Sequence, residues 1–337
     1  EFNNEHMVKS VLNVMYKEIR GLHEAAYILA LFTFGSQILA LVRDRMFAHQ
    51  FGASIELDIY YTAFRIPDLM FVVFASVLSV YVLIPFVATA HERGGSPAMR
   101  EILSQVFSLF LFGYGVLATV ILVFAPAITS ILFPGFSPTE HELLVMLLRI
   151  LLLQPLLLSV SNLFGVVTQF SHRFVLYSLS PILYNLGIII GIVYFYPYFG
   201  VPGLAFGVVL GAFLHVGIQI PFMVKTGMVP ALVRHFDTPQ LFKILETSIP
   251  RALTLSLHQI VLLALLGVAS VMASGSVSVF QFAYNLQSVP LAIIGVSYSV
   301  AAFPTLARMF THGDKLEFVV HVGSALRHIF FWSLPVL

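Results

Sequence analysis

The chain has 337 residues, of which 59% are apolar and only 10% are charged, with a net charge of +1 and a mean hydropathy of +0.95. Soluble domains carry about 25% charged residues, so this composition excludes a soluble enzyme, a nucleic-acid binder and a disordered scaffold. Cysteine is absent, which excludes disulfides and thiolate metal sites. We therefore expect an all-α polytopic membrane protein, with no nucleic-acid partner, no cofactor and no metal site.

Nine apolar stretches are long enough to cross the hydrocarbon core of a bilayer, which takes about 20 helical residues. The second, fourth and eighth exceed one bilayer thickness, so they must tilt, kink or extend into water. Prolines such as Pro67 and Pro155 offer points for kinks. The predicted spans are 26–42, 59–88, 102–132, 143–170, 175–196, 202–224, 249–273, 277–307 and 318–337.

The lysines and arginines that lie between the spans are found mostly on one side of them. Eleven of the 17 precede the first span or lie in every second connection, whereas the alternate connections carry only Arg43 and Arg45. The positive-inside rule then places the N-terminus in the cytoplasm. Ahead of the first span, apolar residues at helical spacing from Val8 to Leu22 predict an amphipathic helix over residues 1–24 on the cytoplasmic membrane surface.

Two stretches of the chain resemble each other at an offset of about 220 residues. One contains the turn Phe51-Gly52-Ala53-Ser54, and the other contains Ser274-Gly275-Ser276-Val277. Six spans separate the two starts, so both copies enter the membrane from the same side and form a parallel repeat, which is typical of transporters. We expect a two-lobe transporter with a six-helix lobe over 25–230. Residues 231–337 are then the first part of a truncated second lobe of about three helices, and the chain is a fragment of a longer protein.

Charged residues cluster in and around the first two spans. Such groups are costly at membrane depth and generally face a cavity or a partner. Arg43 and Arg65 carry planar guanidinium groups suited to a diphosphate, and Asp44 and Asp68 would hold them when the cavity is empty; Asp58 is a weaker candidate. The alternative is an outer-surface loop stabilised by ion pairs.

Other residues are less specific. Arg251 follows Pro250 at the start of the seventh span, so either extension to the cytoplasmic surface or ligand contact would explain it. Glycines at spacings of four predict close packing between the fifth and sixth spans. No His-Glu-x-x-His, Gly-x-Ser-x-Gly or Walker motif is present, so we expect no enzyme.

The strings Ser36–Asp44, Phe51-Gly52-Ala53 and Ala63–Asp68 resemble the MviN/MurJ family of lipid II flippases, which belongs to the multidrug/oligosaccharidyl-lipid/polysaccharide exporter superfamily. The stretch from Ala273 to Pro304 is similar to the eighth helix of that family. The resemblance implies about fourteen spans in two lobes. It also implies movement of an undecaprenyl-diphosphate-linked peptidoglycan precursor to the outer leaflet of the bacterial inner (cytoplasmic) membrane, by alternating access.

The family pattern assigns an Arg-Asp pair to Arg43 and Asp44, an acid to Asp58, and a basic residue before proline to Arg65. Gln37 and Asn285 stand where typical members carry arginine, which implies weaker or rearranged diphosphate binding. The substrate-binding candidates are therefore Arg43, Asp44, Arg65, Asp58, Asp68, Gln37, Asn285 and Arg251.

The expected partners are the lipid-linked precursor and membrane lipids, and coupling to the membrane potential or to a cation stays open. One alternative is an exporter of another polyprenyl-linked saccharide or of drugs. The other is a membrane scaffold that transports nothing, which the missing arginines would allow.

Overall fold

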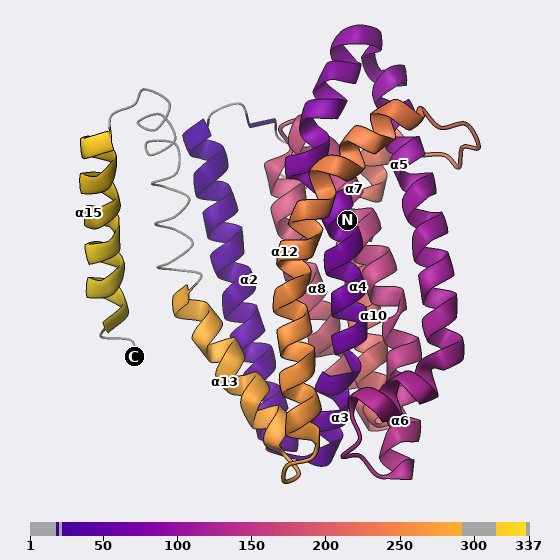
Figure 1. Cartoon of the computed structure of the whole chain (residues 1–337), viewed down its shortest axis with the longest axis vertical. Helices are drawn as coiled ribbons and strands as arrows, with labels where there is room; N and C mark the ends of the chain where they lie inside the picture. Colours follow the sequence, from indigo (N-terminus) through magenta and orange to yellow (C-terminus); the bar gives the residue numbers. More distant parts are fainter. Residues whose placement is uncertain (1–17, 20–21, 292–314, 335–337) are drawn as a thin grey trace, which may run out of the picture. The chain divides into compact units, whose positions relative to one another are not determined.

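The computed structural model describes residues 18–19, 22–291 and 315–334, and the regular elements within these ranges are all helical (Figure 1). The all-α prediction is therefore confirmed for this part of the chain. Two compact units are present, Glu1–Ser278 and Val279–Leu337. The predicted surface helix over 1–24 lies almost entirely outside the described residues.

The helices follow one another along the chain with short connections. They are α2 (Leu22–Phe51), α3 (Ile55–Ala63), α4 (Arg65–Val77), α5 (Val80–Leu132), α6 (Pro138–Leu151), α7 (Leu153–Phe170), α8 (Phe174–Ile190), the π-helical turn η1 (Gly191–Phe195), α9 (Tyr196–Phe199), α10 (Val201–Gly217), α11 (Ile220–Lys225), α12 (Thr238–Ser270), α13 (Ser276–Pro290) and α15 (Lys315–Ser333).

Six helical stretches of the described residues are long and apolar enough to cross a membrane. Five correspond one to one with predicted spans, and the predicted second and third spans are joined into one stretch. The predicted span 277–307 lies partly outside the described residues. The six are Tyr27–Phe51, Ile55–Leu132, Pro138–Phe170, Phe174–Phe199, Val201–Lys225 and Thr238–Ser270.

Two of the long spans are broken one turn ahead of a proline. Pro67 and Pro155 are each the third residue of their helices, and the breaks fall at Phe64 and Leu152. Proline has no N–H to donate and its ring clashes with the carbonyl four residues earlier, so the preceding turn cannot continue a straight helix. The kinks expected at Pro67 and Pro155 are therefore confirmed.

The joined second and third spans bend at two glycines. Gly94 and Gly95 lie inside α5 with non-helical backbone angles, and Gly95 has a φ of +65°. Only glycine adopts this left-handed region without strain. The bend reverses the chain at the end of the bundle drawn uppermost in Figure 1, so a glycine corner replaces the connecting loop that the sequence predicted.

Helices α8 and α10 pack so closely that side chains are excluded from the contact. A Cβ added to Gly187 on α8 would lie 2.2 Å from the Cα of Gly211, and one added to Gly191, the first residue of η1, would lie 2.6 Å from the Cα of Gly207. This backbone-to-backbone approach confirms the small-residue packing predicted for the fifth and sixth spans.

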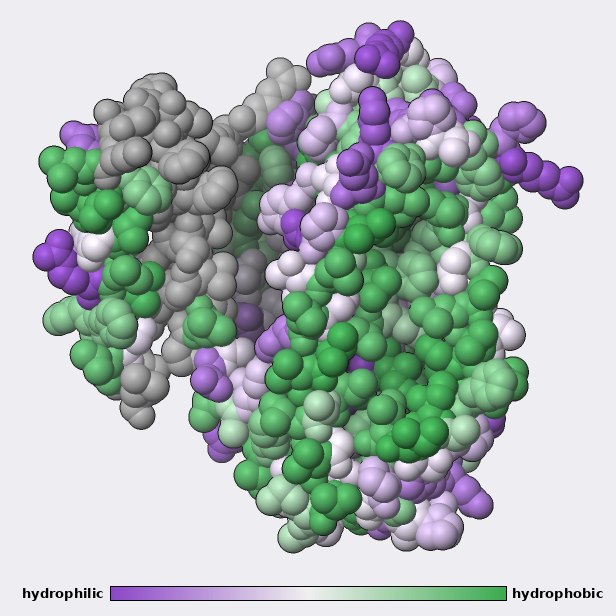
Figure 2. Space-filling model, viewed as in Figure 1, coloured by the Kyte–Doolittle hydropathy of each residue, from purple (hydrophilic) through white to green (hydrophobic). Residues whose placement is uncertain are grey.

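The outer surface of the bundle is apolar where lipid would surround it. Leu31, Phe124 and Val268 are more than half exposed. Figure 2 shows that apolar side chains cover the middle of the face formed by α5 and α12, whereas hydrophilic side chains gather towards its ends. A soluble protein rarely exposes so large an apolar area, so this distribution fits a bilayer.

Candidate functional site

The guanidinium group of Arg43 lies between α2 and α8 inside the bundle. Its Nε and Nη2 donate to Asp44 Oδ1 at 3.0 and 2.8 Å, and its Nη1 donates to Asn185 Oδ1 at 2.8 Å. The side chains of Arg43 and Asp44 are only 18% and 14% exposed. Arg43 therefore does not extend into bulk solvent, although it belongs to an apolar span.

Asn185 on α8 accepts the hydrogen bond from Arg43 and is itself held in place by other hydrogen bonds. Its side chain is buried, and its Nδ2 donates to Ser36 Oγ at 3.3 Å and to the carbonyl of Pro181 at 3.2 Å. Both ends of the amide are thus hydrogen-bonded, which fixes the oxygen towards Arg43. The sequence analysis missed Asn185; the available signal was an asparagine inside the apolar stretch 175–196.

Arg65 and Asp68 lie in the first turn of α4, close to the Arg43 pair. The Arg65 side chain is 5% exposed, and Asp68 interacts electrostatically with it and accepts a hydrogen bond from Gln154. Arg43 and Asp44 on α2 and Arg65 and Asp68 on α4 are two positive and two negative groups, so their charges balance. Balance of this kind makes burial of charge tolerable at membrane depth.

Tyrosine side chains connect the two charged pairs. Tyr61 is close enough to interact electrostatically with Arg43 and Arg65, and Tyr184 on α8 interacts in the same way with Arg43 and Asp68. The structure therefore gathers four predicted residues, Arg43, Asp44, Arg65 and Asp68, into one neighbourhood, which we call the arginine cluster.

Asp58 has different partners. Its buried carboxylate accepts the backbone N–H groups of Gly275 and Ser278, each at 2.7 Å, and the hydroxyl of Ser278. Since α13 begins at Ser276, these bonds satisfy amides at the start of that helix. Asp58 thus links α3 to the α12–α13 connection rather than to the arginines.

The two turns joined by Asp58 are the pair that the sequence repeat aligned. Gly275 has a φ of +90°, and a Cβ there would lie 2.7 Å from the carbonyl oxygen of Ala53. Ser278 Oγ also donates to the carbonyl of Ser54 at 3.3 Å. The turn before α3 and the turn before α13 are therefore in direct contact.

The remaining predicted residues lie elsewhere. Gln37 is half-buried on α2. Arg251 is exposed on α12, with its guanidinium carbon 4.9 Å from the ring centroid of Tyr81, a cation–π contact. Asn285 accepts a hydrogen bond of 2.7 Å from Gln281 within α13. Arg251 has no described contact with the arginine cluster, and Asn285 belongs to the second compact unit.

The six apolar helical stretches of membrane-spanning length in the described residues define a multi-pass membrane protein. The family model described as "Lipid II flippase MurJ" matches residues 47–337. A "Probable lipid II flippase MurJ" of Buchnera aphidicola is 31% identical over 310 residues, 91% of this chain and 61% of the relative. The "Lipid II flippase MurJ" of Burkholderia cenocepacia is 26% identical, over 90% of this chain and 60% of the relative. The chain therefore belongs to the MurJ lipid II flippase family.

Solved structures share the fold. A lipid II flippase MurJ in an inward closed conformation has a TM-score of 0.72 at 23% identity, covering 92% of this chain and 64% of that one. An inward-facing multidrug resistance transporter of the MATE family, within the MOP superfamily, has a TM-score of 0.74 at 16% identity, covering 89% and 68%. The chain spans about three fifths of the length of the curated relatives it matches.

Proposed function

We propose that this chain is part of a flippase that moves lipid II, the undecaprenyl-diphosphate-linked peptidoglycan precursor, from the inner to the outer leaflet by alternating access. The observation that carries the proposal is the arginine cluster. Arg43 and Arg65 are sheltered among apolar helices, and two neighbouring arginines at that depth are the arrangement expected where an anionic group is received.

In this mechanism the Asp44 carboxylate binds Arg43 when no substrate is present. It takes two of the donors of Arg43, at Nε and Nη2, while Asn185 takes a third at Nη1. A diphosphate competes with the Asp44 carboxylate for the same donors, because both present anionic oxygen acceptors to the guanidinium group. Asn185 keeps its bond throughout and therefore sets the direction in which Arg43 points.

The bonds of Asp58 act as a closure in the same proposal. They lie at the end of the bundle opposite the basic connections, which is the outer end if the N-terminus is cytoplasmic. Outward opening requires Gly275 and Ser278 to leave the Asp58 carboxylate. The closure uses hydrogen bonds, which can break and reform within a transport cycle.

The proposal includes a location and a domain organisation. The N-terminus is cytoplasmic, residues 1–24 lie on the inner surface of the bacterial cytoplasmic membrane, 25–230 form the first lobe, and 231–337 begin the second. Gln37, Arg251 and Asn285 complete the substrate-binding set. Transport is coupled to the membrane potential or to a cation.

Complementation of a flippase-depleted bacterial strain by the full-length gene tests the proposal. We expect the wild-type gene and Arg45→Ala to restore growth, because Arg45 is exposed and outside the cluster, and Arg43→Ala and Arg43→Lys to fail. Lysine keeps the charge but lacks the planar fork with which Arg43 bonds Asp44 twice and Asn185 once. If a wild-type protein that reaches the membrane fails to rescue, lipid II is not the substrate.

A second candidate follows from the likeness to a multidrug resistance transporter, whose TM-score is 0.74. An exporter of drugs or of another polyprenyl-linked saccharide would use the same fold. Resistance to cationic drugs without rescue of growth would favour that function, whereas neither phenotype would favour a membrane scaffold.

A further inference from the structure

The connection between α11 and α12, residues 228–237, is fixed along the side of α5; we call it the strap. The N–H of Ala231 donates to Ser104 Oγ at 3.0 Å, and the N–H of Val233 donates to Ser108 Oγ at 2.9 Å. Two residues of extended chain advance about 6.6 Å, and four residues of helix advance about 6.0 Å. The alternate amides of the strap therefore match successive turns of α5.

Both ends of the strap are also held. Arg100 Nε donates to the carbonyl of Val229 at 3.0 Å, and the N–H of Asp237 donates to Gln105 Oε1 at 2.9 Å. The backbone is thus satisfied by side chains of α5, and the strap is a built part of the fold rather than a loose loop. The side chains that the strap exposes therefore have defined positions.

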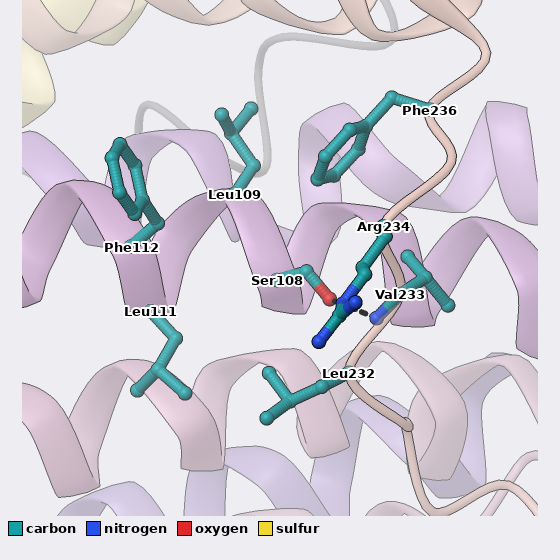
Figure 3. A pocket seen from close by; sticks show the side chains of 8 residues that line it. All are labelled: Ser108, Leu109, Leu111, Phe112, Leu232, Val233, Arg234 and Phe236. Atoms are coloured by element: carbon teal, nitrogen blue, oxygen red, sulfur yellow. Dashed lines mark hydrogen bonds between the residues drawn. The ribbon is translucent and has the colours of Figure 1, made fainter.

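The strap and α5 enclose an open pocket of about 680 Å³ (Figure 3). Its walls are almost wholly apolar, and much of that apolar surface is open: Phe112 is 74% exposed, Leu232 is 70% exposed and Phe236 is 42% exposed. Arg234 lines the same pocket and is exposed. Among the described residues Arg234 has no hydrogen bond or ion pair, so its charge is available to a ligand.

We propose that this pocket binds an anionic glycerophospholipid from the leaflet on the side of the basic connections. The guanidinium group of Arg234 receives the phosphate, and the side chains of Leu109, Phe112 and Phe236 contact the acyl chains. One cation at the edge of an apolar surface matches the amphipathic chemistry of such a lipid. The positive charge of Arg234, the one charged residue among the described residues that line the pocket, favours an anionic headgroup over a zwitterionic one, which carries a positive charge of its own.

This site is separate from the arginine cluster and does not depend on the proposed transport. None of its residues contacts Arg43, Asp44, Arg65 or Asp68 in the described part of the chain. If the strap does not bind lipid, the proposed transport of lipid II is unaffected. If the protein does not transport lipid II, the proposed lipid site at the strap is likewise unaffected.

Quenching of a local tryptophan by brominated lipids tests the proposal in the reconstituted full chain. The single native tryptophan is replaced by Trp332→Phe, and Phe112→Trp introduces an indole in the pocket at a largely exposed position. Brominated phosphatidylglycerol and brominated phosphatidylcholine are compared at equal mole fractions. We expect phosphatidylglycerol to bind about fivefold more strongly than phosphatidylcholine, because one basic residue near a membrane surface strengthens the binding of an anionic lipid by about that factor.

Arg234→Gln should bring the two lipids to equal affinity, whereas Lys243→Gln, an exposed position outside the pocket, should keep the preference. A second probe, Val268→Trp on the exposed surface of α12, should show no preference with Arg234 present. Any one of three results would overturn the proposal. They are equal quenching by the two lipids at position 112, a preference for phosphatidylglycerol that remains in Arg234→Gln, and the same preference at position 268. Displacement of phosphatidylglycerol by undecaprenyl phosphate at an equal mole fraction would also overturn it, since the pocket would then belong to the carrier lipid.

Discussion

Arg43 is held by two partners of different kinds. Asp44 neutralises its charge, and Asn185 only orients it. An arriving diphosphate can replace the first partner because it brings its own negative charge. It gains nothing by replacing the second, so Asn185 is expected to be a positioning residue for the substrate.

Substitution of Asn185 separates orientation from charge. We expect Asn185→Ala to weaken binding of a lipid-linked diphosphate to the full-length protein about tenfold, the value of one hydrogen bond to a charged group. Asn185→Asp should weaken it further, because a second carboxylate competes for Arg43 and repels the phosphate. Equilibrium binding in detergent measures both, with Arg45→Ala as control. Unchanged affinity in Asn185→Asp would show that Asn185 does not position Arg43 for the substrate.

Asp58 is the residue whose removal should open the protein at the turns before α3 and α13. We expect Asp58→Ala to lower the melting temperature in detergent, because buried amides lose a charged acceptor worth about 2 kcal/mol. The chain has no cysteine, so Thr62→Cys, at a position 1% exposed, reports opening directly. A polar thiol reagent should label Thr62→Cys faster in the Asp58→Ala background.

The matched control for Asp58 is Glu56→Gln, since Glu56 is an exposed carboxylate two residues away. It should change neither the melting temperature nor the labelling rate. Equal labelling with and without Asp58 would mean that the contact with α13 does not close the structure.

Two kinds of contact join helices in this fold. One is close packing through glycines, and the other is a hydrogen bond from a side chain to a backbone carbonyl that a proline has left without its helical donor. The second is seen where Pro126 leaves the carbonyl of Leu122 on α5 without its helical donor. Nη2 of Arg149 on α6 donates to that carbonyl at 3.3 Å. A missing backbone bond in lipid is costly, so Arg149 has a structural use at membrane depth that requires no ligand.

The glycine face between α8 and α10 gives a sharper prediction. A Cβ at Gly207 would lie 2.4 Å from the Cα of Gly191, which no rotamer change can relieve. We expect Gly207→Ala to destabilise the protein by about 2 kcal/mol through overpacking, measured as a lower melting temperature in detergent. Gly217→Ala in the same helix has open space around its Cβ and should leave the melting temperature unchanged. Similar melting temperatures for the two variants would contradict the close helix contact.

At the scale of the whole molecule, the arrangement of basic residues makes a prediction about topology. Single cysteines at His235 in the strap and at Tyr198 in α9 occupy exposed positions at opposite ends of apolar spans. In intact cells an impermeant thiol reagent should label Tyr198→Cys and should reach His235→Cys only after the membrane is permeabilised. The reverse pattern would place the N-terminus outside and would also reverse the assignment of Asp58 to the outer end.

Much of the architecture could be predicted from the sequence. The apolar spans, the kinks near Pro67 and Pro155 and the glycine contact between α8 and α10 all follow from local chemistry. Bilayer thickness fixes the length of a span, and a backbone in lipid must bond to itself, so composition alone specifies helices there. The glycine corner in α5 was not predicted, because a turn and a bent helix have similar sequences in that stretch.

Within the candidate site, the sequence identified the charges and the tertiary structure decided their partners. Arg43 is charged wherever it lies, but its bond to Asn185 spans 142 positions, and that of Asp58 to Gly275 spans 217. Contacts between residues so far apart depend on how several helices pack. Periodicity and composition describe each helix by itself. Membrane residence was thus determined by the sequence alone, whereas the division of Asp44 and Asp58 between charge balance and helix capping was decided only in the folded bundle.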